Sequence, residues 1–100
     1  MSNNVYIINR SAHDFSDAKR FGELIFCTEG TVERFDTSQM FRELSEALSD
    51  SQPTDYLLLT SLPALCCVAC AIFAAKHQCL NLLLHRADGY IARSLYLKNL

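Results

Sequence analysis

Short apolar runs alternate with polar segments along the chain, and their periods predict strands and helices. Residues 4–9 (NVYIIN) are β-branched or aromatic at their centre and are bounded by asparagines, which predicts a first buried strand. The polar segment after them leaves room for only a short helix, with Ser16 as its N-cap and Gly22 as its stop. Residues 23–28 (ELIFCT) predict a second strand.

After Asp36 the apolar residues recur with the period of a helix, and their spacing predicts an amphipathic helix. The residues of this apolar face are Met40, Phe41, Leu44, Ala47 and Leu48. Asp36 or Thr37 is expected to cap the first turn while Gln39 reaches back, as in a capping box. The helix is expected to stop before Pro53. Residues 56–60 (YLLLT) lack alternation, which is typical of a strand buried on both faces of a parallel sheet.

A second and largely apolar helix is predicted at residues 62–75, with Ser61 as its N-cap and Pro63 in its first turn. Residues 80–84 predict a fourth strand. The turn signal RADG at residues 86–89 then predicts a hairpin that closes the sheet as an antiparallel edge.

These elements predict the α/β class. With 100 residues, half of them hydrophobic and a fifth charged, the chain has the size and composition of one small globular domain, residues 1–100. We expect a mostly parallel sheet of four to five strands, flanking helices, right-handed crossovers and the C-terminal hairpin.

A membrane span is the alternative for part of this pattern. Residues 56–75 carry no charge and are long enough to cross a bilayer. Thr60, Ser61 and Pro63 interrupt the run at the point where a strand would pass into a helix. A core helix of about 14 residues is therefore favoured, and a membrane-associated protein stays the alternative.

The charge limits the kinds of partner that are expected, and the cysteine content indicates the cellular compartment. Nine basic and eleven acidic residues give a net charge of −2 without long runs of one sign, so no footprint for nucleic acid is expected. The five cysteines are odd in number, and no secretory segment is recognised before them. Cys66, Cys67 and Cys70 fit small buried hydrophobes in a reducing compartment, which favours the cytoplasm.

The positions of the cysteines and histidines disfavour redox and metal chemistry, and the glycine content disfavours a nucleotide cofactor. Cys67 and Cys70 form C-x-x-C, but they lie a turn or more inside the predicted helix, beyond the reach of its dipole. Cys79 and His77 lack the paired spacing of a zinc site, so no metal is predicted. With three glycines and no phosphate-binding motif, no cofactor is predicted.

Candidate binding residues follow from the fold class, because parallel α/β sheets bind ligands beyond the carboxyl ends of their strands. The polar residues after the predicted strands are Asn9, Arg10, Ser11, His13, Asp14, Thr28, Glu29, Thr60, Ser61, His85 and Arg86. From these we select seven ligand-binding candidates: Asn9, Ser11, His13, Asp14, Glu29, Thr60 and Ser61.

Two of these groups carry alternative interpretations. Thr60 and Ser61 precede a helix whose free amides suit an anion, but a serine before a helix also serves as an ordinary N-cap. His13 with Glu29 or Asp14 is a possible base and its orienting group. The alternative is a polar loop in which Asp14 caps the short helix.

Two stretches resemble small uncharacterised α/β proteins encoded by bacteriophages. They are SAHDFSDAKRFGEL at residues 11–24 and DYLLLTSLPALCCVACAIFAAKHQCLNLLL at residues 55–84. The likeness covers most of the chain, has no catalytic signature and transfers no functional residue. It implies a phage or mobile-element origin and an accessory role.

Three classes of function follow. The first is a non-enzymatic interaction protein that binds a host or viral protein. The second is a small-ligand-binding protein or hydrolase, and the third is the membrane-associated protein. Because helix 62–75 is apolar all round, with small residues four apart at Cys67, Ala71 and Ala75 and at Cys66, Cys70 and Ala74, a homodimer or larger assembly is also expected.

Overall fold

The strands form one five-stranded sheet in the order β2-β1-β3-β4-β5 in a computed structural model, which describes residues 3–60 and 62–100. The strand bounds are β1 Asn4–Ile7, β2 Glu23–Phe26, β3 Tyr56–Leu58, β4 Cys79–Arg86 and β5 Gly89–Tyr96. The first four strands run parallel, and β5 pairs antiparallel with β4. The predicted α/β class and the edge hairpin are therefore confirmed.

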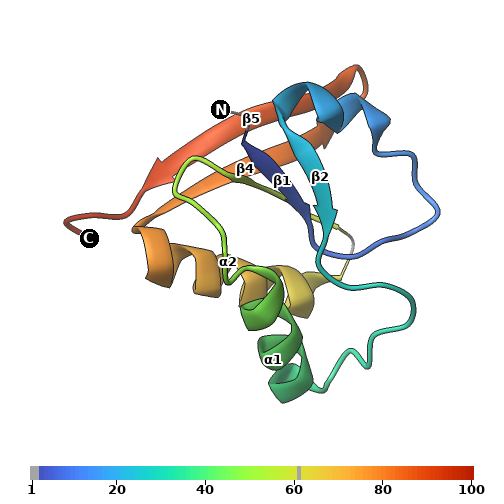
Figure 1. The fold of residues 1–100 in the computed structure, drawn as a ribbon, viewed down its shortest axis with the longest axis vertical. Coiled ribbons are helices and arrows are strands. Elements are labelled where there is room, and N and C mark those ends of the chain that lie inside the picture. Colours follow the sequence, from blue (N-terminus) through green and yellow to red (C-terminus); the bar gives the residue numbers. More distant parts are fainter. Residues whose placement is uncertain (1–2, 61) are drawn as a thin grey trace.

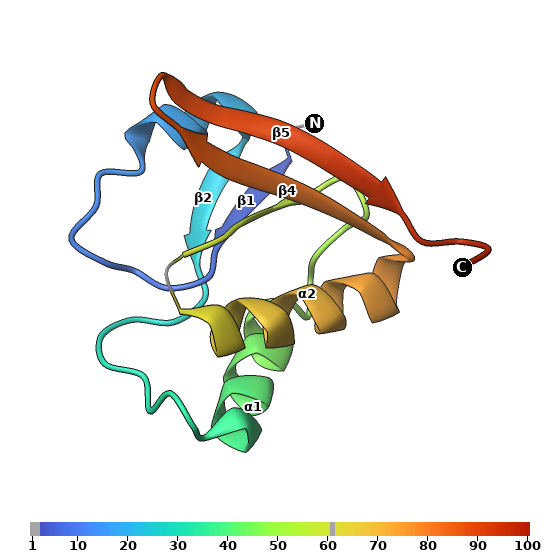
Figure 2. The same cartoon turned by 180° about the vertical axis from the view of Figure 1, so that it is seen from behind.

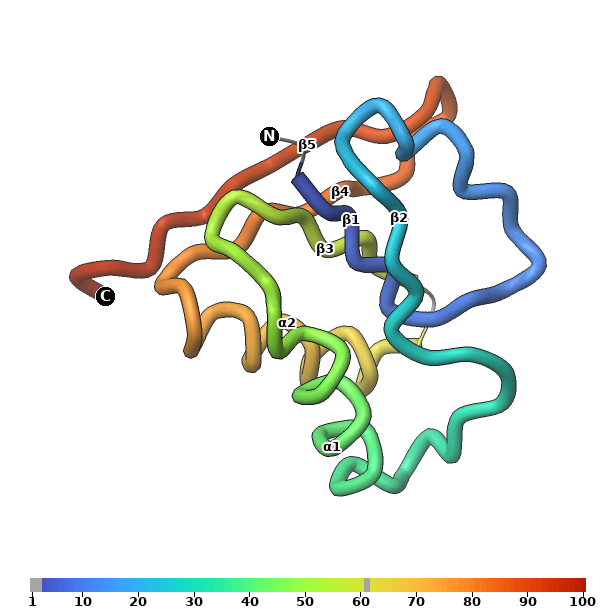
Figure 3. Tube along the Cα trace, viewed as in Figure 1, coloured from blue at the N-terminus to red at the C-terminus, as the bar shows by residue number. Residues whose placement is uncertain are grey.

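The two faces of the sheet are covered differently. Helices α1 (Thr37–Ala47) and α2 (Pro63–His77) lie on one face and contact each other (Figure 1). The other face carries η1 (Ser16–Phe21), a short 3-10 helix that contacts β1, β2 and β5. Strand β3 pairs with β1 and with β4 and so lies in the interior of the sheet, and the tube trace in Figure 3 shows the three strands close together.

Strand β3 is buried from both sides, as its lack of alternation predicts. Leu57 belongs to the cluster under α1 and α2, and Leu58 to the cluster under η1. In the first cluster the buried residues of the two helices are Met40, Leu44, Leu65, Ala69 and Phe73. One strand therefore anchors two separate apolar cores.

Helix α1 starts at the predicted cap but presents a narrower apolar face than predicted. Asp36 Oδ1 accepts a hydrogen bond from the Gln39 backbone N–H at 3.0 Å. The Gln39 side chain instead donates to Glu43 at 2.8 Å and so completes no capping box. Phe41 is 57% exposed, because it lies about 100° around the helix from buried Met40 and off the buried stripe.

Helix α2 takes up most of the uncharged segment. Residues 56–75 divide into β3 and the larger part of α2, which ends at His77 and is capped by Gln78 in a left-handed conformation. None of the helices in residues 3–60 and 62–100 has the length and apolarity needed to cross a membrane. Leu62 takes the N-cap position, and the predicted cap Ser61 lies outside the described residues.

The short helix between β1 and β2 differs from the prediction at its start and agrees with it at its end. Ser16 opens η1 without capping it, and its N–H donates to Asp14 Oδ1 at 2.9 Å. Gly22 ends η1 as predicted. An added Cβ at Gly22 would lie 2.1 Å from the backbone oxygen of Asn3, so this close approach to β1 requires glycine.

The β4–β5 hairpin is long and projects past the other strands, as the view from behind shows (Figure 2). Its register pairs Arg86 with Gly89 and His85 with Tyr90 on either side of the turn. The Arg20 guanidinium donates to the backbone oxygen of Tyr90 at 2.9 Å. The tip of the hairpin is thereby tied to η1, on the face of the sheet opposite the helices.

Candidate ligand site at the carboxyl ends of β1 and β3

The strand order reverses at β1, which pairs with β2 on one side and β3 on the other. Ligands bind open parallel sheets at such a switch point, beyond the carboxyl ends of the strands. A cavity of about 280 Å³ lies there. Its lining residues are Asn9, Ser11, His13, Asp14, Phe15, Leu58, Leu59, Thr60, Leu62, His85 and Tyr90.

Three segments that are distant in the sequence build this cavity. The loop after β1 supplies its polar side chains at Ser11, His13 and Asp14. The end of β3 and the residue before α2 supply leucines, which form an apolar wall. The hairpin adds His85 and Tyr90 from the far side. Sequence distance is therefore no guide to which residues meet here.

Five of the seven predicted ligand-binding residues line this one cavity: Asn9, Ser11, His13, Asp14 and Thr60. Ser61 lies outside the described residues. Glu29 does not line it, because its Oε1 accepts a hydrogen bond from Arg10 Nε at 3.0 Å on an exposed surface. The pair of His13 with Glu29 is therefore not formed across this cavity.

Asn9 has a structural role at the back of the site. Its Nδ2 donates to Thr28 Oγ1 at 2.8 Å and to the Gly30 backbone oxygen at 3.4 Å. The Thr28 hydroxyl in turn donates to the Ile8 backbone oxygen at 2.8 Å. These buried bonds hold the loops after β1 and β2 together, so the floor of the cavity is fixed before any ligand arrives.

Ser11 and Asp14 shape the loop that forms the polar wall. Ser11 Oγ accepts from the His13 backbone N–H at 3.3 Å. Asp14 accepts from the backbone N–H of Ser16, and the hydrogen bonds from Ser16 lower the pKa of the Asp14 carboxyl. Asp14 is therefore ionised at neutral pH beside the cavity. It bonds the first residue of η1, but Phe15 takes the N-cap position without a side-chain cap, so the cap expected of Asp14 is not formed.

Two aromatic pairs flank the cavity. The rings of His13 and Phe15 meet edge to face with centroids 6.3 Å apart, and those of His85 and Tyr90 with centroids 5.5 Å apart. Burial raises the pKa of the Tyr90 phenol, and Asp17 and Asp14 add to the effect, so this group stays a neutral donor. Tyr90 was not among the sequence-based candidates, although the hairpin register places it opposite His85.

Thr60 lies at the junction of β3 and α2, where a cysteine closes the turn. The Thr60 backbone N–H donates to Cys66 Sγ at 3.4 Å, and the Cys66 thiol donates to the Thr60 backbone oxygen at 3.4 Å. Burial raises the pKa of Cys27 to about 12 and that of Cys70 to about 11, which disfavours both thiolates. Cys66 and Cys70 are half-buried and fit the structural role that the sequence predicts. Cys67 is exposed, so the prediction of a buried side chain is wrong for Cys67, which lies on the outward side of α2.

The cavity brings hydroxyl and imidazole groups together. Within residues 3–60 and 62–100, no hydrogen bond joins the hydroxyls of Ser11 or Thr60 to a ring nitrogen of His13 or His85. A nucleophile needs such a contact with its base. In the same part of the chain, no group of three or more His, Cys, Asp or Glu side chains is placed to hold a metal ion.

A family model supports the resemblance to phage proteins. The model described as phage Pam3 gp32-like protein matches residues 3–92, which include both stretches on which the predicted resemblance depends. The expected likeness to phage-encoded proteins is therefore confirmed. No curated protein and no solved structure matches the chain significantly.

Proposed function

The chain belongs to the phage Pam3 gp32-like family, and from that premise we propose that it is a phage protein that binds a small ligand at the carboxyl ends of β1 and β3. One observation carries the proposal. Five polar residues expected from the strand-end rule come together around one cavity, with an apolar wall opposite them. These residues come from two segments that are distant in the sequence, the loop after β1 and the segment after β3.

The size of the cavity limits the ligand. Its volume of about 280 Å³ lies just below the usual range for small-molecule sites, which begins at about 300 Å³, so only a small ligand fits. The Thr60 hydroxyl, the two imidazoles and the Tyr90 phenol are the groups that could bond its polar atoms.

A fragment screen followed by amide NMR tests this proposal. Small polar fragments should shift the amide signals of residues 9–15, 58–60 and 85–90. Thr60→Val should weaken the best fragment about tenfold by removing one hydroxyl. Thr54→Val, at an exposed threonine before β3, is the matched control and should leave the affinity unchanged. Shifts confined to other surfaces, or no shift with any fragment, would contradict the proposal.

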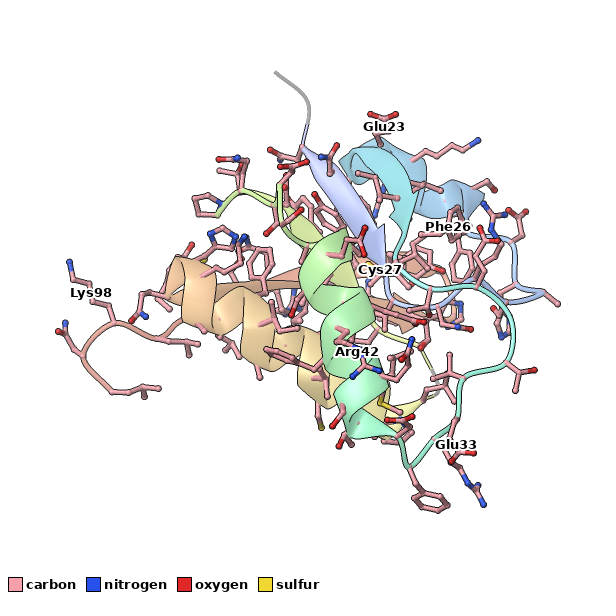
Figure 4. The ribbon with its side chains drawn as sticks, turned by 60° about the horizontal axis from the view of Figure 1, so that its bottom comes forward. Glu23, Phe26, Cys27, Glu33, Arg42 and Lys98 are labelled. Carbon is pink, nitrogen blue, oxygen red and sulfur yellow. The ribbon has the colours of Figure 1, made fainter. Side chains whose placement is uncertain are left out.

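A second candidate function is self-association through the helix face. Phe41 is exposed and lines a groove between α1 and α2 together with Val68, Ala71, Ile72 and Ala75 of α2, and α1 also contributes Thr37, Ser38 and Arg42. Figure 4 shows α1 crossing α2, with Arg42 on the side of α1 away from the sheet. An exposed aromatic ring within a largely apolar groove suits a two-fold contact between two copies.

Helix α1 leaves less of α2 uncovered than the sequence suggested. The buried residues of α1 share one cluster with those of α2, so α1 covers part of the apolar surface of α2. The homodimer or larger assembly therefore stays a proposal for the remaining exposed face. Light scattering should give at least twice 11.3 kDa. Ala71→Arg should yield monomers while Ala87→Arg, in the hairpin turn, should not.

We also propose that the protein works in the cytoplasm. All five cysteines are free thiols in the structure, which suits a reducing compartment. An oxidising compartment would be expected to trap the exposed Cys67 in mixed disulfides.

A further inference from the structure

We propose that the ligand of this cavity carries a planar aromatic ring, an inference that rests on the proposed function. Aromatic side chains supply four of the eleven lining residues: His13, Phe15, His85 and Tyr90. In the whole chain, the six Phe, four Tyr and three His are a far smaller share of 100 residues. Aromatic side chains, which recognise rings, are therefore enriched in the lining of this cavity.

These aromatic side chains come from two separate segments. His13 and Phe15 belong to the loop after β1, whereas His85 and Tyr90 lie on opposite strands of the hairpin. Each pair already has the edge-to-face geometry that aromatic rings prefer, with interplanar angles of 67° and 70°. A planar ring between the two segments can extend the same pattern to both.

The aromatic walls are held in place without a ligand. Phe15 is 8% exposed, and its ring meets Phe26 edge to face with centroids 6.0 Å apart. The Arg10 guanidinium carbon lies 3.7 Å from the centroid of the Phe26 ring. On the other side, Tyr90 is 9% exposed and its backbone oxygen accepts from Arg20. Such a preformed site loses little entropy on binding.

The remaining walls fit the flat faces and the edges of a ring. Leu58, Leu59 and Leu62 offer apolar contact, whereas Ser11 and Thr60 bring polar atoms to the same space. A saturated ring of the same carbon skeleton has the apolar surface but is thicker and lacks the quadrupole that edge-to-face contacts need. Each such contact corresponds to about two- to tenfold in affinity.

A matched pair of probes tests the inference. 2-Naphthol is planar, and decahydro-2-naphthol has the same skeleton and hydroxyl but puckered rings. Titrations followed by amide NMR should give 2-naphthol at least about tenfold tighter binding, with shifts at residues 9–15 and 85–90. Equal affinities would overturn the aromatic inference while leaving small-ligand binding in place. Failure of both probes and of all fragments would overturn both.

Two variants test which side chains cause the preference for the planar probe. Tyr90→Leu should reduce the preference for 2-naphthol to about threefold or less, whereas Tyr96→Leu, at an 80% exposed tyrosine on the same strand, should leave it unchanged. Because Tyr90 is buried, the amide spectrum must first show that Tyr90→Leu is folded. His13→Leu, in the exposed part of the loop, tests the opposite wall. An unchanged preference in both folded variants would overturn the inference.

Discussion

Ser51 Oγ lies 2.9 Å from His77 Nε2, and this hydrogen bond ties the turn before β3 to the last turn of α2. The His77 ring also meets Phe73 edge to face with centroids 4.5 Å apart. Nearby, Lys76 Nζ donates to the Ser49 backbone oxygen at 2.9 Å. Ser51 is 5% exposed, so this serine and histidine form a structural link and not an accessible nucleophile and base.

Burial of the His77 ring should make stability depend on pH. Burial lowers the pKa of His77, and the charge of Lys76 lowers it further. The folded state therefore binds protons more weakly at this site than the unfolded chain, whose histidine pKa is about 6.5. The contribution of His77 to the free energy of unfolding is fully present above about pH 6.5, and it decreases as the pH falls below that value.

Urea unfolding at pH 7.5, 6.5 and 5.5 measures this effect. His77→Gln should be less stable at pH 7.5, by about 1 kcal/mol for the lost contacts, and should show a weaker loss of stability at acid pH. His13→Gln, at an exposed histidine, is the control for the replacement of a histidine by glutamine. The same acid loss in His77→Gln as in the wild type would contradict this assignment.

Leu58→Asp should prevent stable folding. Leu58 is 2% exposed in the interior strand β3, and a carboxylate there has no described partner in its apolar cluster. An unpaired buried charge costs about 3 to 5 kcal/mol, a large share of the stability of a small domain. Circular dichroism and solubility would show the effect. Leu95→Asp, at a half-exposed position on β5, should stay folded. Soluble, folded Leu58→Asp protein would contradict the burial of β3.

Gly22→Ala should lower the melting temperature more than Gly30→Ala does. The Cβ added at Gly22 would overlap the backbone of Asn3, which cannot move without disturbing β1. At Gly30, where φ is +75°, the added Cβ meets nothing within 4 Å, and only the left-handed backbone costs about 1 kcal/mol. Thermal unfolding of both variants gives the comparison, and an equal shift would contradict the steric argument.

Thiol reactivity should separate the cysteines by exposure. Cys67 is exposed, whereas burial raises the pKa of Cys27 and Cys70 to about 12 and 11. Ellman's reagent at pH 7.5 should therefore label one thiol rapidly, and Cys67→Ser should remove that phase. A rapid phase that persists in Cys67→Ser would show that a buried thiol becomes accessible. Freshly purified protein should also give the same monomer band on reducing and non-reducing gels.

The local pattern of apolar and turn residues was sufficient to predict most of the strands and helices. The uninterrupted apolar run at residues 56–60 predicted an interior strand because such a strand needs apolar cover on both faces, and Leu57 and Leu58 have it. The hairpin turn at residues 86–89 was predictable for a similar reason, since a short turn fixes the register of its strands. The strand-end rule then selected five residues of the cavity without any motif.

By itself, the sequence determined the class of each segment, the α/β fold and the edge hairpin, because hydrophobic period and turn residues act over a few positions. The tertiary structure decided which of these segments meet. Strand order brought Tyr90 to the loop that carries His13, whereas it left Glu29 with Arg10. The crossing of α1 over α2 likewise left Phe41 exposed. Such pairings depend on how distant apolar faces cover one another, and no short stretch of sequence contains that information.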